Sequence, residues 1–261
     1  MVTVDLERRG PFEQCRVLGV DCFAGNLGAA ARAVVVRALD RRGGYCCCCN
    51  VHVLTLALHD ALLRDALSDA WARFPDGAPI AWLERRRGVS AERVAGPDLM
   101  PAVLALGSDV GLRHYLLGST SNVLERLEDR LALAFPDAQI VGALSPPVTT
   151  GQPDVSLDTV SATEPDIVWC AFGAPKQELW MHRHFAELGS GLMIGVGAAF
   201  DFLAGTQRRA PTWLQDHSLE WLYRLMSEPR RLSGRYISTN SEFIVRATIE
   251  ILRNRPARRV G

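Results

Sequence analysis

An acidic residue in a turn is the first feature of the sequence that could do chemistry. Asp76 stands in the Pro-Asp-Gly turn at Phe74–Gly77, ahead of an apolar run at Ile80–Leu83 that we expect to be a strand. Ligands of open α/β sheets bind in the crevice at the strand ends, and a carboxylate there could accept a proton from a substrate. Pro-Asp-Gly is also common turn chemistry, so Asp76 alone leaves both interpretations open.

A carboxamide follows another predicted strand. Asn50 comes directly after the apolar run Tyr45–Cys49. Its side chain offers both a donor and an acceptor for the hydroxyl groups of a sugar. The same side chain is a good cap for the helix that follows, and the residue by itself favours capping.

The segment Gly173–Glu178 joins a predicted strand to a predicted helix. Gly173 would let the backbone approach a ligand, and the start of a helix offers free N–H groups and a positive dipole end. Lys176, the only lysine of the chain, could add a charge, and Gln177 could bond the edge of a base or a sugar. The spacing of a Walker phosphate-binding loop is absent.

A second glycine-rich segment, Gly195–Asp201, resembles half of a dinucleotide fingerprint. Phe200 occupies the third small position, and no later acidic partner is evident, so the segment does not predict NAD binding. Asp201 fits a helix cap as well as a ligand contact.

Arginines gather toward the C-terminus, at Arg208, Arg209, Arg224, Arg230, Arg231 and Arg235. Guanidinium groups bind phosphate through two parallel hydrogen bonds, although a solvated face with ion pairs has the same composition. No D-x-D sequence occurs, so the carboxylate pair that commonly holds Mg²⁺ or Mn²⁺ against a nucleotide diphosphate is lacking. The G-x-S-x-G and H-E-x-x-H motifs are absent too.

The composition is that of an ordinary globular protein. Its 261 residues are 48% hydrophobic with zero net charge, which argues against intrinsic disorder. No apolar run reaches the length of about 18 residues that a spanning helix needs. The first ten residues lack the apolar region of a secretory signal, so we expect a cytoplasmic protein.

The charge is unevenly distributed along the chain. Residues 1–206 carry 18 basic and 24 acidic side chains, whereas residues 207–261 carry 11 arginines and 5 acidic side chains. We therefore expect a core domain at 1–206 and a basic helical appendage at 207–261. A basic appendage suits an anionic partner, such as a phosphate, a lipid surface or a nucleic acid.

Short apolar runs alternate with helical patterns up to about residue 205. The strands that we expect are Arg16–Val20, Tyr45–Cys49, Ile80–Leu83, His114–Leu117, Gln139–Gly142, Ile167–Phe172 and Leu192–Val196. The helices between them are Leu27–Leu39, Val53–Trp71, Val123–Phe135 and Lys176–Leu188. This alternation predicts an α/β fold, a Rossmann-like, mostly parallel sheet with helices on both faces.

The appendage reads as two helices, Thr212–Met226 and Arg230–Arg253, separated by Pro229. Helices rich in arginine and tryptophan could lie on a membrane interface, or their apolar stripe could pack on the sheet.

The seven cysteines include a run of four, Cys46–Cys49. Neighbouring side chains of a strand point to opposite faces, which is poor disulfide geometry. The spaced pairs of a zinc site are missing. We expect reduced, buried thiols in an intracellular protein and no metal site.

Taken in order, the motifs resemble the WecG/TagA/CpsF family of bacterial glycosyltransferases from about residue 15 to 240. The matching segments are Asn50–His52, Pro75–Gly77, Glu92–Leu99, Leu117–Ser119, Gly173–Glu178, Gly195–Asp201, Arg209–Pro211, Glu220–Leu225 and Glu228–Leu232.

The resemblance implies an inverting transferase. Such enzymes move a hexose or N-acetylhexosamine-type sugar from a nucleotide diphosphate donor, here expected to be UDP-linked, to an undecaprenyl-diphosphate-linked sugar. They act in cell-surface polysaccharide synthesis as peripheral proteins on the inner face of the cytoplasmic membrane. The family is regarded as metal-independent, which implies no cofactor, and its C-terminal appendage is thought to touch the membrane and close the site.

The resemblance also implies roles for single residues. Asp76 matches the proposed general base, and Asn50 and Gln177 match residues of the sugar pocket. Arg224 and Arg231, with Arg235 as the expected third, would offset the charge of a diphosphate.

Other matched positions are less specific. Cys48 stands where many members have threonine, and a thiol is a weaker hydrogen-bond partner than a hydroxyl. Arg93 and Asp98 match as substrate-binding residues, although both fit a structural role. Gly173, Lys176 and Asp201 complete the expected set.

Two other functions fit parts of the sequence. The first is a nicotinamide-dependent sugar-nucleotide oxidoreductase or epimerase, which the missing G-x-G-x-x-G disfavours. The second is a non-catalytic module that binds nucleotides or RNA through the basic appendage. The acidic core and the lack of an RNA-binding pattern argue against a nucleic acid partner. A homo-oligomer is compatible with the sequence.

Overall fold

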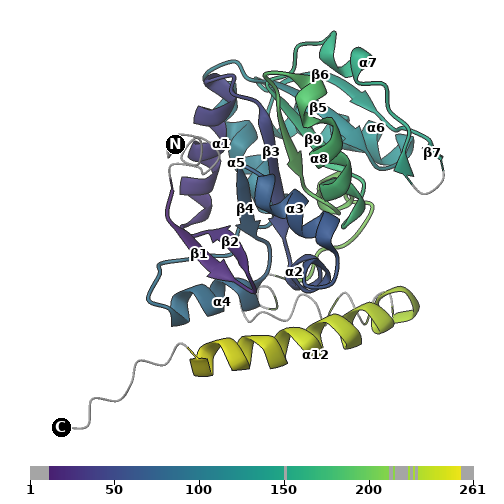
Figure 1. Cartoon of the computed structure of the whole chain (residues 1–261). Helices are drawn as coiled ribbons and strands as arrows, with labels where there is room; N and C mark the ends of the chain where they lie inside the picture. The colour runs from purple at the N-terminus through teal and green to yellow at the C-terminus, as the bar shows by residue number, and fades with distance from the viewer. Residues whose placement is uncertain are drawn as a thin grey trace.

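A six-stranded, fully parallel sheet forms the centre of the protein in a computed structural model, which describes residues 12–149, 152–211, 214, 223, 226 and 229–253 (Figure 1). The strand order is β4-β3-β10-β9-β5-β6. The strands are β3 (Gly44–Cys49), β4 (Ala72–Pro75), β5 (Arg113–Gly118), β6 (Gln139–Leu144), β9 (Ile167–Ala171) and β10 (Leu192–Gly195). The predicted fold class is confirmed.

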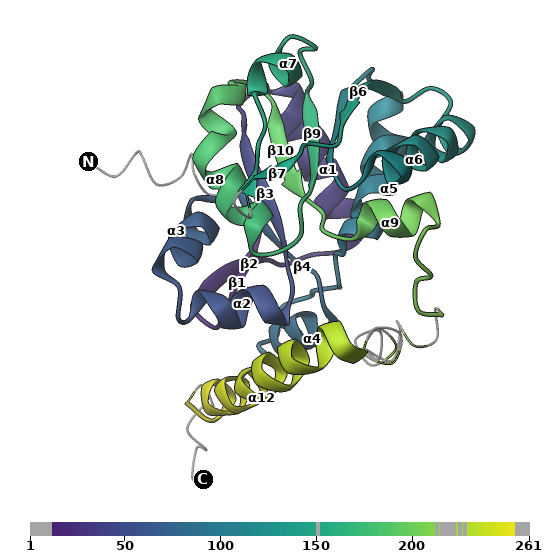
Figure 2. The same ribbon diagram turned by 90° about the vertical axis from the view of Figure 1, so that its right-hand side faces the viewer.

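Helices cover both faces of this sheet (Figures 1 and 2). One face packs against α1 (Leu27–Leu39), α5 (Gly96–Ser108), α6 (Ser121–Ala134) and α9 (Ala199–Ala204). The other packs against α2 (Val51–Ala57), α3 (Ala61–Asp69), α7 (Leu157–Ser161) and α8 (Lys176–Leu188). The bounds of α1 and α8 are those predicted from the sequence.

The cysteine run forms most of β3, and its side chains alternate between the two cores. Cys46 and Cys48 belong to one hydrophobic cluster, and Cys47 and Cys49 belong to the other. A strand that is buried on both faces needs small apolar side chains at every position. All seven cysteines of the chain are buried and free, as predicted.

The predicted strand Ile80–Leu83 is wrong, because this segment lies in α4 (Ala78–Arg86). The strand is β4, eight residues earlier. Two features hide β4 in the sequence, since it contains a charged residue, Arg73, and ends at Pro75. The buried Arg73 side chain donates hydrogen bonds to the backbone carbonyls of Asp21, Leu67 and Ala70, which lets a guanidinium occupy a core strand.

Two other predicted elements differ from the structure. The segment Arg16–Val20 is not one strand of the sheet but part of an antiparallel hairpin, β1 (Gln14–Val17) and β2 (Val20–Phe23). Its turn places Leu18 and Gly19 at φ of 48° and 85°, as a two-residue hairpin loop requires. The predicted helix Val53–Trp71 is broken at Asp60, whose side chain caps α3 by accepting a hydrogen bond from Leu63 N.

A short hairpin, β7 (Val148–Thr149) and β8 (Gln152–Pro153), follows β6. The chain then returns through α7 to β9.

The appendage contributes a long helix, α12 (Pro229–Arg253), which confirms the predicted helix Arg230–Arg253. Pro229 is its first residue rather than a separator. Most of the predicted helix Thr212–Met226, and the N-terminal ten residues on which the expected location rests, lie outside the described residues. Phe243 and Ala247 of α12 are buried in the core that contains α2, and Thr55 donates a hydrogen bond to the carbonyl of Thr239 at 3.4 Å.

A buried histidine makes the stability of the sheet sensitive to acid. His114 of β5 has no exposed surface, accepts a hydrogen bond from Trp169 Nε1 at 3.3 Å and stacks on that ring. Burial lowers the pKa of His114 to about 4. The folded protein therefore keeps this imidazole neutral, whereas the unfolded chain takes up a proton near its ordinary pKa of about 6.5.

The stability that this difference provides is present above pH 6.5 and is lost as the pH falls toward 4. Between pH 7 and pH 5, we expect the free energy of unfolding of the wild type to fall by about 2 kcal/mol relative to His114→Gln. Urea denaturation at both pH values measures this difference. A difference between His114→Gln and the wild type that does not vary with pH would contradict the prediction.

Candidate active site

The candidate residues lie along the carboxyl edge of the sheet, and this edge includes a point where the connections after neighbouring strands pass to opposite faces. After β9 the chain continues into α8 on one face, and after the neighbouring β5 it continues into α6 on the opposite face. Diverging connections leave a crevice outside the strand ends, which is where open α/β sheets bind their ligands.

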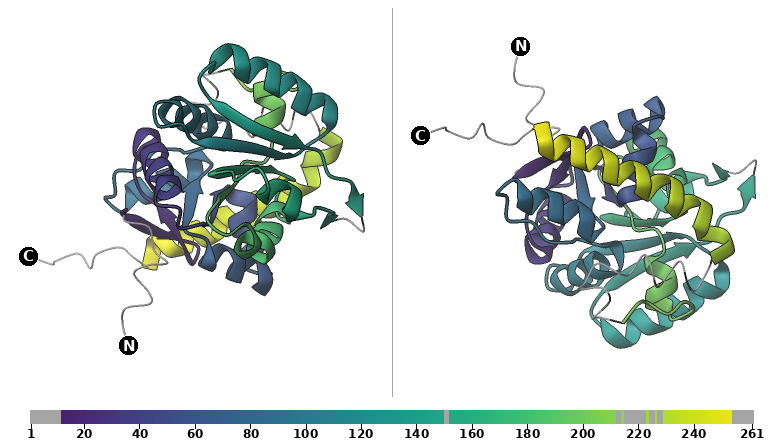
Figure 3. Two further views of the ribbon diagram at one scale, coloured as in Figure 1. Left: turned by 90° about the horizontal axis from the view of Figure 1, so that it is seen from above. Right: turned by 90° about the horizontal axis from the view of Figure 1, so that it is seen from below.

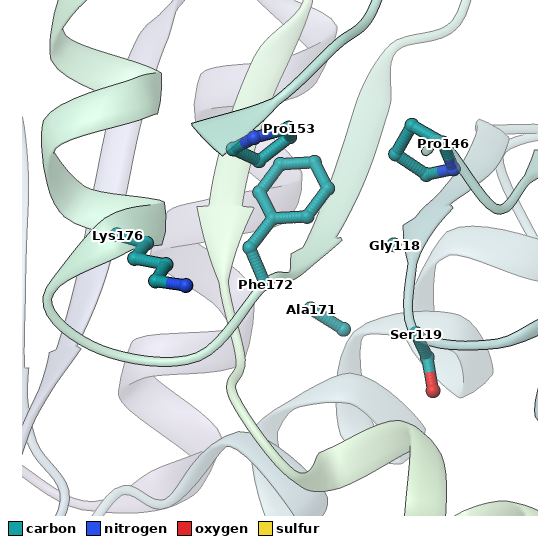
Figure 4. A pocket seen from close by; sticks show the side chains of 7 residues that line it. All are labelled: Gly118, Ser119, Pro146, Pro153, Ala171, Phe172 and Lys176. Atoms are coloured by element: carbon teal, nitrogen blue, oxygen red, sulfur yellow. The ribbon is translucent and has the colours of Figure 1, made fainter. Parts of the chain in front are cut away.

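A cavity of 170 Å³ lies in this crevice (Figure 4). It is lined by Gly118, Ser119, Pro146, Pro153, Ala171, Phe172 and Lys176. The backbone carbonyl of Ala171 accepts a hydrogen bond from Ser119 N at 3.1 Å. A Cβ atom at Gly118 would lie 2.8 Å from that same carbonyl group, and the φ of Gly118 is 112°, so only glycine fits here.

One positive side chain borders the cavity. Lys176 is the first residue of α8, and the helix start has no side-chain cap, so its N–H groups and its dipole favour an anion. Gly173, three residues before Lys176, has a φ of 78°. No heavy atom lies within 4 Å of the position that a Cβ atom would occupy there. Of the predicted residues Gly173 and Lys176, Lys176 lines the cavity, and Gly173 directly follows Phe172, which also lines it.

Asp76 lies at the same edge, directly after β4. Its backbone N–H donates to the carbonyl of Cys49 at 2.8 Å, and its side chain is half-buried. Burial, and then the charge of Asp76, raise the pKa of the Cys48 thiol well above its ordinary value. Asp76 and Cys48 are therefore neighbours, and the thiol stays neutral beside the carboxylate.

Asn50 follows β3, next to Asp76 along the edge. Its side-chain oxygen accepts a hydrogen bond from Val53 N at 3.1 Å and caps α2. The capping role that the sequence offered is the one observed, and the carboxamide remains half-buried at the site.

Gln177, the second residue of α8, is almost fully buried. Its side chain is only 2% exposed. The amide nitrogen donates to Glu178 at 2.9 Å, and the amide oxygen accepts from the backbone N–H of Gly197 at 3.1 Å. Gln177 therefore fixes the turn after β10, which leads to α9 and Asp201. Asp201 lies in the first turn of α9, where its side chain accepts a hydrogen bond from Thr206.

A profile of the glycosyl transferase WecG/TagA/CpsF family matches residues 15–257, which include every loop of this edge. The chain belongs to this family. One relative is the N-acetylglucosaminyldiphosphoundecaprenol N-acetyl-beta-D-mannosaminyltransferase of Bacillus spizizenii, which is 28% identical over 193 residues, or 74% of each chain.

In this WecG/TagA/CpsF member, Asp98 is the centre of an ion-pair network. Arg209 contacts its two carboxylate oxygens at 2.6 and 2.7 Å, and Arg93 contacts one of them at 3.1 Å. Burial alone would raise the pKa of Asp98, but the hydrogen bonds and charges of the two arginines lower it below its ordinary value. The network ties the start of α5 to the segment after α9, which gives Arg93 and Asp98 a structural role, and their contact with a substrate stays a prediction.

The predicted arginines of the appendage fall into two groups. Arg231 and Arg235 lie in the first half of α12, and Arg224 lies outside the described residues. Gly118, Phe172 and the two prolines line the cavity but are not among the predicted site residues. The family segment Leu117–Ser119 includes Gly118 but none of the other three, because cavity walls made of apolar side chains look like core positions in a sequence.

Proposed function

We propose that this glycosyltransferase is an inverting enzyme that moves a hexose or N-acetylhexosamine-type sugar from a UDP-linked donor to a sugar on undecaprenyl diphosphate. The observation that carries the proposal is the position of Asp76, a half-buried carboxylate at the strand edge of a family member. The name of the Bacillus spizizenii relative supports an undecaprenyl-diphosphate-linked N-acetylglucosamine as the acceptor.

In this proposal, Asp76 is the general base. The acceptor hydroxyl attacks the anomeric carbon from the face opposite the nucleotide, and Asp76 takes the hydroxyl proton as the new carbon–oxygen bond forms. The bond to the diphosphate breaks at the same time, and the nucleotide diphosphate leaves with the electron pair. The configuration at the anomeric carbon is thereby inverted.

The leaving diphosphate needs positive charge, and several groups of the chain could supply it. Lys176 and the uncapped start of α8 border the cavity, while Arg231 and Arg235 lie on α12. Preorganised cations and N–H dipoles stabilise a developing negative charge. We propose that they take the place of a metal ion, so that the enzyme needs no cofactor.

A lipid-linked acceptor requires contact with a membrane, and α12 has a suitable outer surface. Ile244, Val245, Ile249 and Leu252 of α12 are exposed. On the neighbouring α4, Trp82 is exposed, and the guanidinium carbon of Arg86 lies 5.0 Å from the centroid of its ring. Apolar and aromatic side chains with flanking arginines bind anionic interfaces. Within the described residues, no helix is long and apolar enough to cross a membrane. We propose a peripheral protein on the inner membrane face.

The double variant Ile244→Ser/Ile249→Ser should bind anionic lipid vesicles about tenfold more weakly, because two branched side chains no longer enter the acyl boundary. Vesicle sedimentation over a range of lipid concentrations measures the affinity. Leu133→Ser, at an 85% exposed leucine on α6, is the matched control and should bind as the wild type does. Equal binding by the double variant would exclude α12 as the membrane contact.

A donor panel tests the proposed function as a whole. The full chain is incubated with UDP- and GDP-linked sugars and with a short-chain polyprenyl-diphosphate N-acetylglucosamine, with and without a chelator. We expect transfer from a UDP-linked N-acetylhexosamine, a product of inverted configuration and no loss of rate with chelator. Thermal stabilisation by NAD instead of UDP would favour the oxidoreductase, and stabilisation by oligonucleotides alone would favour the binding module.

A further inference from the structure

An ion pair at the far end of α12 joins the helix to the core domain. Arg87 is the residue after α4, and its Nη2 atom lies 2.6 Å from Oε1 of Glu250 in α12. The other carboxylate oxygen of Glu250 accepts a hydrogen bond from the backbone N–H of Leu18 at 3.4 Å, in the turn of the β1–β2 hairpin. One carboxylate thus connects three elements, α12, α4 and the hairpin.

This ion pair is more sheltered than the other described contact of its kind on α12. The side chains of Arg87 and Glu250 are 22% and 25% exposed, whereas His59, which pairs with Glu242 of α12, is 62% exposed. Exposed ion pairs contribute little, while breaking a sheltered pair leaves a poorly solvated charge behind. Arg87 and Glu250 are therefore the charged pair expected to hold α12 most strongly.

A second carboxyl group lies close to Arg87 but does not pair with it in the structure. Glu84 is one helical turn earlier on α4, has no exposed surface, and neither of its carboxyl oxygens has a hydrogen-bond partner among the described residues. The guanidinium of Arg87 thus contacts a residue of α12 rather than this neighbour on its own helix. The ion pair between Arg87 and Glu250 therefore connects α4 to α12.

The ion pair fixes where α12 lies relative to the site. α4 begins two residues after Asp76, and α2, which packs on Phe243 and Ala247, begins directly after Asn50. α12 runs along this side of the molecule from the β1–β2 hairpin toward β7 and β8 (Figures 1 and 3). Arg235 lies about 22 Å from Glu250 along the helix, so a contact at one end sets the position of the other.

We propose that Arg87 and Glu250 are positioning residues that hold α12 across the carboxyl edge of the sheet and thereby keep its Arg231–Arg235 segment at the active site. Neither side chain touches a substrate. The effect on turnover rests on the proposed function, whereas the effect on the docking of α12 does not.

Hydrogen exchange and kinetics on the full chain test the proposal. Glu250→Gln keeps the shape of the side chain and removes its charge, and Glu84→Gln removes the carboxyl that Arg87 does not use. Arg16→Gln breaks an exposed ion pair with Asp21 in the same hairpin and is the matched control. We expect the amides of α12 in Glu250→Gln to exchange about tenfold faster, with unchanged exchange in β3 and β9.

Turnover should change in the same direction, with a lower kcat/KM for the lipid-linked acceptor in Glu250→Gln, because α12 is docked for a smaller fraction of the time. Arg16→Gln and Glu84→Gln should keep wild-type exchange in α12. The exchanged pair Arg87→Glu/Glu250→Arg should recover part of the protection that either single change removes, because the ion pair is restored while arginine at position 250 cannot accept the hydrogen bond from Leu18 N–H.

Unchanged exchange of α12 in Glu250→Gln, equally faster exchange in the sheet, or no recovery in the exchanged pair would overturn the proposal. If the wild type transfers no sugar at all, the proposed function fails, and the exchange of α12 still decides the role of the ion pair.

Discussion

Asp76→Asn should lower kcat for sugar transfer by about 10²–10⁴-fold, the usual contribution of a positioned general base. Asparagine has nearly the same shape, and the backbone N–H of residue 76 can still donate to Cys49, so the fold should be retained. The carboxamide cannot accept the proton of the acceptor hydroxyl. Steady-state kinetics with the lipid-linked acceptor measures the loss, and calorimetric titration with UDP should give an unchanged Kd.

Asp109→Asn is the control for this prediction, because Asp109 is an exposed aspartate at the end of α5, far along the chain from the site. It should keep wild-type turnover. The pH profile offers a second check, since the acidic limb of kcat/KM should be lost together with the base. An Asp76→Asn enzyme with wild-type kcat would remove Asp76 from this role and leave the proton without an acceptor.

Asp76 could be placed at the sheet edge from the sequence, although the strand beside it was misplaced. The sequence contains the Pro-Asp-Gly turn, and its apolar pattern predicts a strand at Ile80–Leu83, after the turn. In the structure the strand is Ala72–Pro75, before the turn. The charged Arg73 interrupts the apolar pattern of β4. Its guanidinium can be buried because the folded structure supplies backbone carbonyl groups as hydrogen-bond acceptors. The local turn sequence therefore predicts that Asp76 lies at the sheet edge, whereas contacts between distant segments determine that the strand precedes the turn.

The helices α1 and α8 could be predicted to the residue because their ends have local causes. Asn26 caps α1 by accepting a hydrogen bond from Ala29 N, and Gly189, at φ of 71°, ends α8. Caps and left-handed glycines act within one turn of the helix, so a sequence window contains them completely.

The contacts of the site residues depend on segments far apart in the sequence. The amide oxygen of Gln177 accepts a hydrogen bond from the backbone N–H of Gly197, twenty residues away. The cavity unites residues from the ends of β5 and β9 and from the β8 hairpin. Their meeting follows from the strand order, which local periodicity does not encode.

Glu84→Gln should raise the free energy of unfolding at pH 7 by about 3 kcal/mol. Glu84 is fully buried, and burial raises the pKa of its carboxyl to about 8 against the lowering charges of Arg87 and Arg85. The folded protein therefore binds a proton at pH 7 that the unfolded chain, with a pKa of 4.5 at this group, releases. Glutamine resembles the neutral carboxyl and has no proton to lose.

The sign of the effect gives the prediction its test. The stability that the protonated Glu84 provides is complete below pH 4.5 and is lost as the pH rises toward 8, so the advantage of Glu84→Gln should be absent at pH 4.5 and grow between these values. Urea denaturation of both proteins at several pH values measures it. A constant difference for Glu84→Gln would mean that its carboxyl is ionised in the folded protein, and that Arg87 is then shared between Glu84 and Glu250.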